Sequence, residues 1–197
     1  MNTSEGHFQK TLDRIFSLTD FERGSRTPEH RMFHLERIKL LLSRISNPHL
    51  DTPTIHIAGS KGKGSTAALI AALLQGSGYT VGLYTSPHLQ TLRERIQINF
   101  SPITELCLAE LAEKILPILE KKWKTQKALT FFETMTLFSF VHFASNNVDF
   151  QVIETGIGGR LDATNVVEPY LSVITPISID HTSLLGETIE LIAQEKA

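Results

Sequence analysis

The hydrophobic pattern divides the chain into an N-terminal helical part and a longer part in which helices alternate with short apolar runs. Apolar residues recur every three or four positions in residues 7–18 and 29–46, which predicts two amphipathic helices. Beyond them, short runs rich in β-branched residues predict strands at Thr54–Ala58, Thr80–Tyr84, Arg95–Phe100, Phe150–Thr155 and Leu171–Thr175. Further helices are expected at residues 65–75, 104–122 and 132–145 and from about residue 188.

Short apolar strands that alternate with helices are typical of a mostly parallel sheet with helices on both faces. We therefore expect an α/β domain over residues 49–197, with residues 1–48 forming a helical segment that packs against it. Pro117 falls inside the expected helix 104–122 and is predicted to kink or split it, because proline lacks a backbone N–H.

Parallel sheets bind their ligands beyond the carboxyl ends of the strands, so the residues found there are candidates for a site. Gly59–Thr66 follows the first strand, and Ser86 follows the second. Glu154 ends the strand at 150–155, and His181 comes after the last strand. We expect these residues to meet at one edge of the sheet.

The loop after the first strand reads GSKGKGS and differs from the pattern GxxxxGK[ST], because Gly64 occupies the Ser/Thr place. Its glycines still allow backbone N–H groups to surround a phosphate, and the following helix directs its positive end there. Lys63 can reach the β- and γ-phosphates, and the Ser65 hydroxyl can ligate Mg²⁺. The residues predicted to bind nucleotide are Gly59, Ser60, Lys61, Gly62, Lys63, Gly64, Ser65 and Thr66. The alternative is an ordinary turn between a strand and a helix.

Four side chains form a plausible magnesium site opposite this loop: Ser65, Ser86, Glu154 and His181. Each also has a simpler interpretation. Glu154 could pair with a structural Lys or Arg, Ser86 could cap a turn, and His181 could be a loop hydrogen bonder. Imidazole is an unusual ligand for so hard a cation, so His181 is the least typical member of the set.

Three other patterns carry less weight. Gly156–Gly159 resembles a dinucleotide fingerprint, but Leu161 stands where its last glycine belongs. His30 and His34 have the spacing of a zinc helix without the usual glutamate, and we expect them on the solvent side. Cys107 lies in an apolar helix stripe and is expected in the core.

Composition narrows the class of protein further. The 197 residues are 41% hydrophobic and carry a formal net charge of −2, which gives no basic field for nucleic acid. The single cysteine cannot form an internal disulfide, which fits a reducing compartment. No apolar run resembles a signal peptide or a membrane span, so we expect a soluble, cytoplasmic protein that binds neither nucleic acid nor membrane.

Taken together, the motifs resemble folylpolyglutamate synthase/dihydrofolate synthase of the Mur ligase superfamily. They are HIAGSKGKGS (56–65), TSPHL (85–89), ETGIGGRLDATN (154–165), IDHTSLLG (179–186) and EKA (195–197). GGRLDATN distinguishes this family from the cell-wall Mur ligases. The resemblance implies the central ATPase domain of a Mur ligase, with a P-loop-type sheet. Family members continue well past EKA into a C-terminal domain. We therefore expect this chain to be truncated, with an incomplete ATPase domain, and inactive and unstable alone.

The resemblance also implies a reaction. ATP phosphorylates the carboxylate of dihydropteroate or a folate, and L-glutamate displaces phosphate from the acyl phosphate, with two Mg²⁺ ions bound. Lys63, Glu154, His181 and Lys196 would then be catalytic, with Lys196 matching a lysine that is carbamylated in the family. Phe132 and Asp162 match positions that contact the pterin. The full-length protein is expected to be a monomer.

Some questions stay open at this point. Ser60 and Lys61 replace the family's usual Thr and Asn, and the aromatic residue expected after SPHL is absent, which leaves the preferred acceptor undecided. A cell-wall Mur-type ligase and a non-catalytic fragment that only binds Mg-ATP are the alternative functions.

Overall fold

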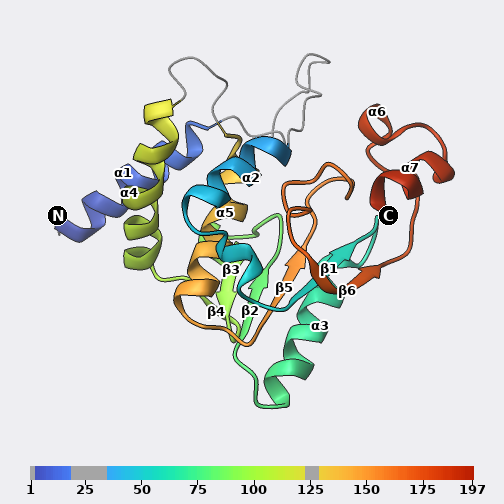
Figure 1. Ribbon diagram of the computed structural model, residues 1–197, viewed down its shortest axis with the longest axis horizontal. Helices are drawn as coiled ribbons and strands as arrows, with labels where there is room; N and C mark the ends of the chain where they lie inside the picture. The colour runs from blue at the N-terminus through green and yellow to red at the C-terminus, as the bar shows by residue number, and fades with distance from the viewer. Residues whose placement is uncertain (1–2, 19–34, 123–128) are drawn as a thin grey trace.

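The computed structural model describes residues 3–18, 35–122 and 129–197, which form a sheet with helices on both faces (Figure 1). Its strands are β1 (Thr54–Ala58), β2 (Val81–Tyr84), β3 (Ile96–Ile98), β4 (Ser101–Pro102), β5 (Phe150–Glu154) and β6 (Pro169–Ile174). Its α-helices are α1 (Thr3–Phe16), α2 (Leu35–Arg44), α3 (Lys63–Gly76), α4 (Glu105–Lys122), α5 (Phe131–Ser145), α6 (Thr182–Leu185) and α7 (Ile189–Lys196). Two short 3₁₀ turns, η2 (Pro48–Leu50) and η3 (Leu92–Arg95), complete the described elements.

The sheet confirms the predicted α/β class. Its strand order is β4-β3-β2-β5-β1-β6. The four strands β2, β5, β1 and β6 run parallel, whereas β3 and β4 add an antiparallel edge. The carboxyl ends of β1, β2, β5 and β6 therefore lie along the same edge, where the candidate residues were expected to meet.

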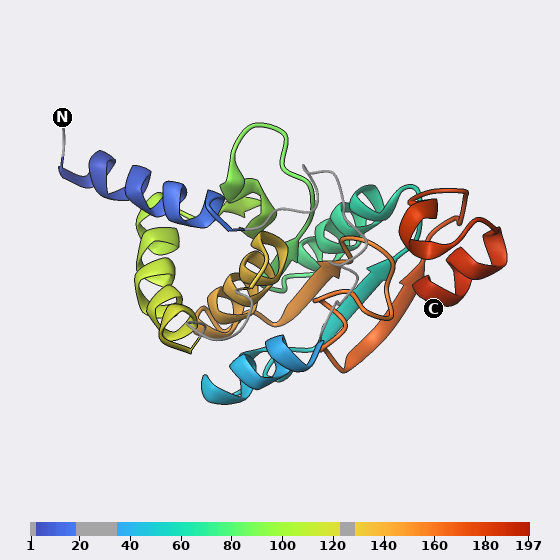
Figure 2. The ribbon, with the colours of Figure 1, turned by 90° about the horizontal axis from the view of Figure 1, so that it is seen from above.

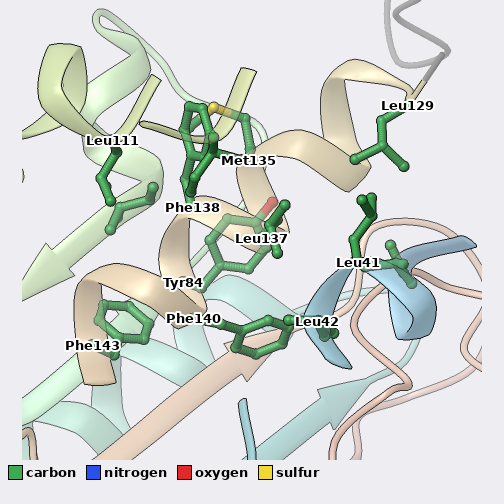
Figure 3. Packing of buried hydrophobic residues seen from close by; sticks show 14 of the residues in the cluster. Leu41, Leu42, Tyr84, Leu111, Leu129, Met135, Leu137, Phe138, Phe140 and Phe143 are labelled. Atoms are coloured by element: carbon green, nitrogen blue, oxygen red, sulfur yellow. The ribbon is translucent and has the colours of Figure 1, made fainter. Parts of the chain in front are cut away.

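Alternation along the strands sends side chains into two separate hydrophobic clusters. Ile55 and Ile57 of β1 face α3, which packs on the sheet through the small residues Ala67 and Ala71. The other face carries the larger cluster, in which the aromatic side chains of α5 meet α2 and Tyr84 (Figure 3). Gly82 is required on that face, because a Cβ there would lie 2.7 Å from the Phe143 ring.

The N-terminal helices α1 and α2 pack on the larger cluster. Helix α1 crosses α4 and contacts it, at the end of the molecule opposite α6 and α7 (Figure 2). Helix α2 is joined to α5 by an ion pair in which Arg37 Nη2 lies 3.0 Å from Glu133 Oε1. Glu133 also accepts the N–H of Thr130, while the Thr130 hydroxyl accepts the N–H of Glu133, which caps α5.

The structure corrects several boundaries. Pro117 does not split the predicted helix, since α4 continues through it as one element; the exposed proline directly follows the buried Ile115 and Leu116. The short helix α6 and the two-residue strand β4 were not predicted. Strand β6 begins at Pro169, two residues earlier than expected.

The expected positions of Cys107 and of the pair His30 and His34 can be compared with the structure. Cys107 is partly buried and packs against the larger cluster, in agreement with its expected place. His30 and His34 lie outside the described residues. Within the described ranges, no helix is long and apolar enough to cross a membrane.

Candidate active site

The glycine-rich loop between β1 and α3 is anchored on one side and open on the other. The N–H groups of Ser60 and Lys61 donate to the Pro176 carbonyl at 3.1 and 3.3 Å, which ties the loop to the segment after β6. Gly59 has φ +139°, and a Cβ there would collide with Thr175. Gly62 has φ +80° and precedes α3, whose amino end receives no described side-chain cap. That end is therefore suited to an anion.

Glu154 lies directly beside the start of α3. Its side chain is 4% exposed, and a Cβ on Gly64 would be 3.4 Å from its Oε2. The same Oε2 accepts the N–H of Ser86 at 3.1 Å. The structure thus brings together the predicted residues at the ends of β1, β2 and β5. A buried carboxylate next to an anion-binding helix end would repel phosphate, so the pair fits a site that also holds a cation.

Lys196, at the end of α7, reaches the same loop. Its side chain is buried, and Nζ donates to the Gly59 carbonyl at 2.9 Å. Burial lowers the pKa of Lys196, the charge of Lys63 lowers it further, and Asp180 and Asp162 act in the opposite direction. Lys196 of the motif EKA therefore contacts the glycine loop, and its lowered pKa favours the neutral amine.

His181 lies on the segment that follows β6, where it precedes α6 with φ +49°. Its side chain is exposed, and Nε2 lies 3.7 Å from Asp180 Oδ1. Ser60 Oγ donates to the Ser178 carbonyl at 3.0 Å, which holds this segment near the glycine loop. Among the described residues, no group of three or more His, Cys, Asp or Glu side chains could hold a metal by itself. A cation here would therefore need hydroxyl, phosphate or water oxygens as well.

Residues 156–165 form a compact loop organised around Asp162. Its Oδ2 accepts the N–H groups of Gly156 and Ile157, both at 3.0 Å. Its Oδ1 accepts the N–H of Thr164 at 3.0 Å and the Thr164 hydroxyl at 2.6 Å. Burial raises the pKa of Asp162, and these hydrogen bonds act against that shift.

The two residues predicted to contact a pterin both adjoin Gly156. A Cβ on this glycine would lie 2.7 Å from the Phe132 ring and 3.1 Å from Asp162 Oδ2. Phe132 is partly buried and tilts against Tyr84, with ring centroids 5.9 Å apart. The close approach of ring, backbone and carboxylate requires a glycine at this point.

The loop is also held from its outer side by α7. Arg160 donates its backbone N–H to the Glu195 carbonyl at 2.8 Å, and its guanidinium lies 2.7 Å from Glu195 Oε1. Gly159 approaches the carbonyls of Glu195 and Lys196, and a Cβ there would lie about 3.0 Å from them. The two loops of the site thus share α7 as a support.

One buried contact was missed by the sequence-based interpretation. His56 Nε2 lies 2.8 Å from Thr164 Oγ1, which links β1 to the loop 156–165. Burial lowers the pKa of His56 to about 4. A histidine within an otherwise apolar strand was the available signal, because a buried polar side chain needs a partner.

A comparison with protein-family models adds a second kind of support. The model of the Mur ligase middle domain matches residues 57–197. The chain belongs to the Mur ligase family. This match includes the glycine loop, Glu154, the loop 156–165 and Lys196.

Known relatives of this Mur ligase chain confirm the narrower resemblance. It is 47% identical over 165 residues to the dihydrofolate synthase/folylpolyglutamate synthase of Bacillus subtilis, covering 83% of this chain and 38% of that protein. It is similar to the crystal structure of folylpolyglutamate synthase from Thermotoga maritima, with TM-score 0.83, 41% identity, and coverage of 98% of this chain and 41% of that one. A folylpolyglutamate synthase complex with AMPPCP and folate matches with TM-score 0.87 and 38% identity, covering 96% and 45% of the two chains. The chain therefore spans about two fifths of the length of these relatives.

Proposed function

We propose that this chain supplies the ATP-binding part of a ligase that joins L-glutamate to the carboxylate of a folate or of dihydropteroate. The observation that carries the proposal is the placement of Glu154, which is buried against Gly64 at the open amino end of α3. A buried carboxylate beside an anion-binding helix end suits a site that holds a metal ion together with phosphate. The similarity to a synthase solved with AMPPCP and folate supports the same assignment.

The glycine loop, residues 59–66, is proposed to bind the phosphates of ATP. Backbone N–H groups at the start of α3 face the phosphates, and Lys63 neutralises charge on the β- and γ-groups. Transfer of a phosphoryl group to an anionic carboxylate depends mainly on such neutralisation and on positioning. The acceptor carboxylate oxygen then bonds to the γ-phosphorus as ADP leaves.

Magnesium would be held by the oxygen ligands Ser65, Ser86 and Glu154, with His181 as a further ligand, and we propose two ions. Bound Mg²⁺ supplies charge stabilisation and orients the phosphate oxygens. The buried Glu154 carboxylate and its contact with the Ser86 segment fit this role. The exposed His181 is the weakest member of the set.

Lys196 is proposed to act as a carbamate. Its neutral amine would add to CO₂ and release one proton, which converts a cation into an oxygen anion that can support a metal. The lowered pKa of Lys196 favours this reaction, because only the neutral amine is nucleophilic. The Lys196 amine lies 2.9 Å from the Gly59 carbonyl of the glycine loop, which supports this proposal.

The acceptor is proposed to bind where Phe132, Gly156 and Asp162 meet. The Phe132 ring offers an apolar surface for a flat heterocycle. Each oxygen of Asp162 already accepts two hydrogen bonds, so its main contribution is to shape the loop that the acceptor contacts. In the second step, the amino group of L-glutamate attacks the acyl carbon, and phosphate and a proton leave.

The decisive experiment is an assay of the complete gene product with Mg-ATP and L-glutamate, supplied with dihydropteroate or tetrahydrofolate in separate reactions. We expect ADP release that requires both glutamate and one of the two acceptors, with formation of the amide product. The pair of reactions also shows whether one acceptor or both are used. Absence of turnover with both acceptors would overturn the proposal. Activity with a UDP-muramoyl acceptor would point to a cell-wall ligase, and nucleotide binding without turnover would indicate a binding module.

A further inference from the structure

A buried chain of three side chains crosses from β1 to the loop 156–165. His56 Nε2 lies 2.8 Å from Thr164 Oγ1, and this hydroxyl lies 2.6 Å from Asp162 Oδ1. The exposed fractions are 8% for His56, 0% for Thr164 and 5% for Asp162. At the far end, Asp162 Oδ2 accepts the N–H groups of Gly156 and Ile157.

The direction of each hydrogen bond in this chain follows from proton counting. The backbone N–H groups of Gly156, Ile157 and Thr164 donate to Asp162, and the Thr164 hydroxyl donates to its Oδ1. The single hydroxyl proton of Thr164 is therefore directed to Asp162, and its oxygen must accept from His56. The imidazole consequently carries a proton on Nε2. Burial of the ring lowers its pKa and so favours the neutral form, with Nε2 as the protonated nitrogen.

We propose that His56 is a positioning residue for the acceptor site. Through the Thr164 hydroxyl it aligns Asp162, and Asp162 in turn holds the Gly156 backbone beside Phe132. The same strand leads at its carboxyl end into Gly59, so β1 would position both the nucleotide loop and the acceptor loop. This inference rests on the proposed function only for the identity of the acceptor, and the hydrogen-bonded chain stands without it.

A purely space-filling role makes a different prediction. On that interpretation only the volume of the side chain at position 56 matters, and an apolar residue of similar size would serve. The positioning role instead requires a hydrogen-bond donor at position 56. Without that donor, the Thr164 hydroxyl keeps its bond to Asp162, but no second group fixes its orientation. Rescue by a donor-bearing substitution separates the two.

The first test uses the unmutated protein and measures the ¹⁵N chemical shifts of the His56 ring at neutral pH. We expect a neutral ring with the proton on Nε2. A ring protonated on Nδ1, or an imidazolium, would overturn the proposal. This measurement requires no variant to fold and no substrate to be known.

The second test compares His56→Leu with His56→Gln, and Thr164→Val with Thr164→Ser, in the complete gene product. Loss of one hydrogen bond in the chain is expected to weaken hydrogen-exchange protection of the Gly156 and Ile157 amides by roughly 5- to 10-fold. The KM for the acceptor should rise by a similar factor in His56→Leu and Thr164→Val, with the KM for ATP within about 2-fold of its original value. His56→Gln and Thr164→Ser should restore both the amide protection and the KM for the acceptor. Equal losses in Leu and Gln, or a parallel rise in the KM for ATP, would contradict the proposal.

The two proposals fail in distinguishable ways. A complete protein without ligase activity on either acceptor would reject the proposed function, while the ring tautomer and the amide exchange would still test the positioning chain. Conversely, normal ligase activity together with unchanged amide hydrogen exchange in His56→Leu would reject only the positioning role of His56.

Discussion

The two loops at the carboxyl edge of the sheet are built in opposite ways. In the glycine loop 59–66, the N–H groups of Ser60 and Lys61 donate to the Pro176 carbonyl, and the amino end of α3 receives no described side-chain cap. The loop 156–165 uses its own carboxylate, Asp162, to accept backbone and hydroxyl protons from within the loop. We call the glycine loop the open loop, because the amino end of α3 is available to a ligand. We call the loop 156–165 the closed loop, because its hydrogen-bond donors are bonded to its own carboxylate.

This difference indicates a division of roles. A loop whose N–H donors are available to an anion is stabilised when that ligand binds. A loop that satisfies its own donors keeps its shape without ligand and can present a fixed surface, here Gly156 and Phe132. Substitutions in the open loop should therefore affect ligand binding first, and substitutions in the closed loop should affect stability first.

The largest expected effect is on the open loop, in Lys63→Ala. Removal of this charge should lower kcat/KM for ATP by roughly 100-fold or more, because phosphoryl transfer depends on charge neutralisation. The free energy of unfolding without ligand should change by less than about 0.5 kcal/mol. Steady-state kinetics and urea unfolding measure the two quantities.

Lys61→Ala is the matched comparison, since Lys61 is exposed and lies in the same loop. A much smaller kinetic effect is expected there. Equal effects from the two lysines would mean that general positive charge, and no specific contact of Lys63, serves the phosphates.

In the closed loop, Asp162→Ala should lower the free energy of unfolding by about 3 kcal/mol, since three buried or partly buried backbone N–H groups lose their acceptor. Urea unfolding of the ligand-free protein measures this loss. Asn165→Ala, an exposed change in the same loop, should cost less than about 1 kcal/mol. A loss of ATP affinity in Asp162→Ala without a loss of stability would contradict the division of roles.

Acid should weaken the closed loop through His56. The folded-state pKa of about 4 lies below the ordinary 6.5, so the unfolded chain binds more protons between these values. This contribution to stability is complete above pH 6.5 and declines as the pH falls toward 4, by about 3 kcal/mol in all. Urea unfolding at neutral and acidic pH measures the slope.

His56→Gln should remove that slope and serves as the reference. Asp162 acts in the opposite sense, because its raised pKa makes stability fall as the pH rises above 3.8. The difference between the original protein and His56→Gln largely cancels this second contribution. Identical pH profiles for the two proteins would show that His56 is not responsible.

The smallest expected effect concerns the ion pair on the outer side of the closed loop. Arg160 is 56% exposed in its pair with Glu195, so Arg160→Ala should cost about 0.2–1 kcal/mol and less at high salt. A double-mutant cycle with Glu195→Gln isolates the pair. A coupling well above 1 kcal/mol would show that this contact supports the loop as strongly as Asp162 does.

Much of this architecture was predictable because local patterns determined it. Strand β1 has the predicted bounds. The carboxyl ends of parallel strands lie along one edge of the sheet, and this rule predicted that Glu154 lies near the glycine loop, as it does. Helix α4 was harder, because burial of its apolar side outweighs the hydrogen bond lost at Pro117. The contact of His56 with Thr164 joins residues 108 positions apart, and no local pattern encodes it.

The bond between Lys196 and the Gly59 carbonyl joins residues 137 positions apart. During synthesis from the N-terminus, the strand and helix around the glycine loop emerge long before this lysine does. The glycine loop therefore acquires this support late, and closing so long a segment is entropically costly and slow. Nucleotide present during refolding should bind with increasing affinity as α7 docks, which would make ATP itself a driving force for assembly of this edge.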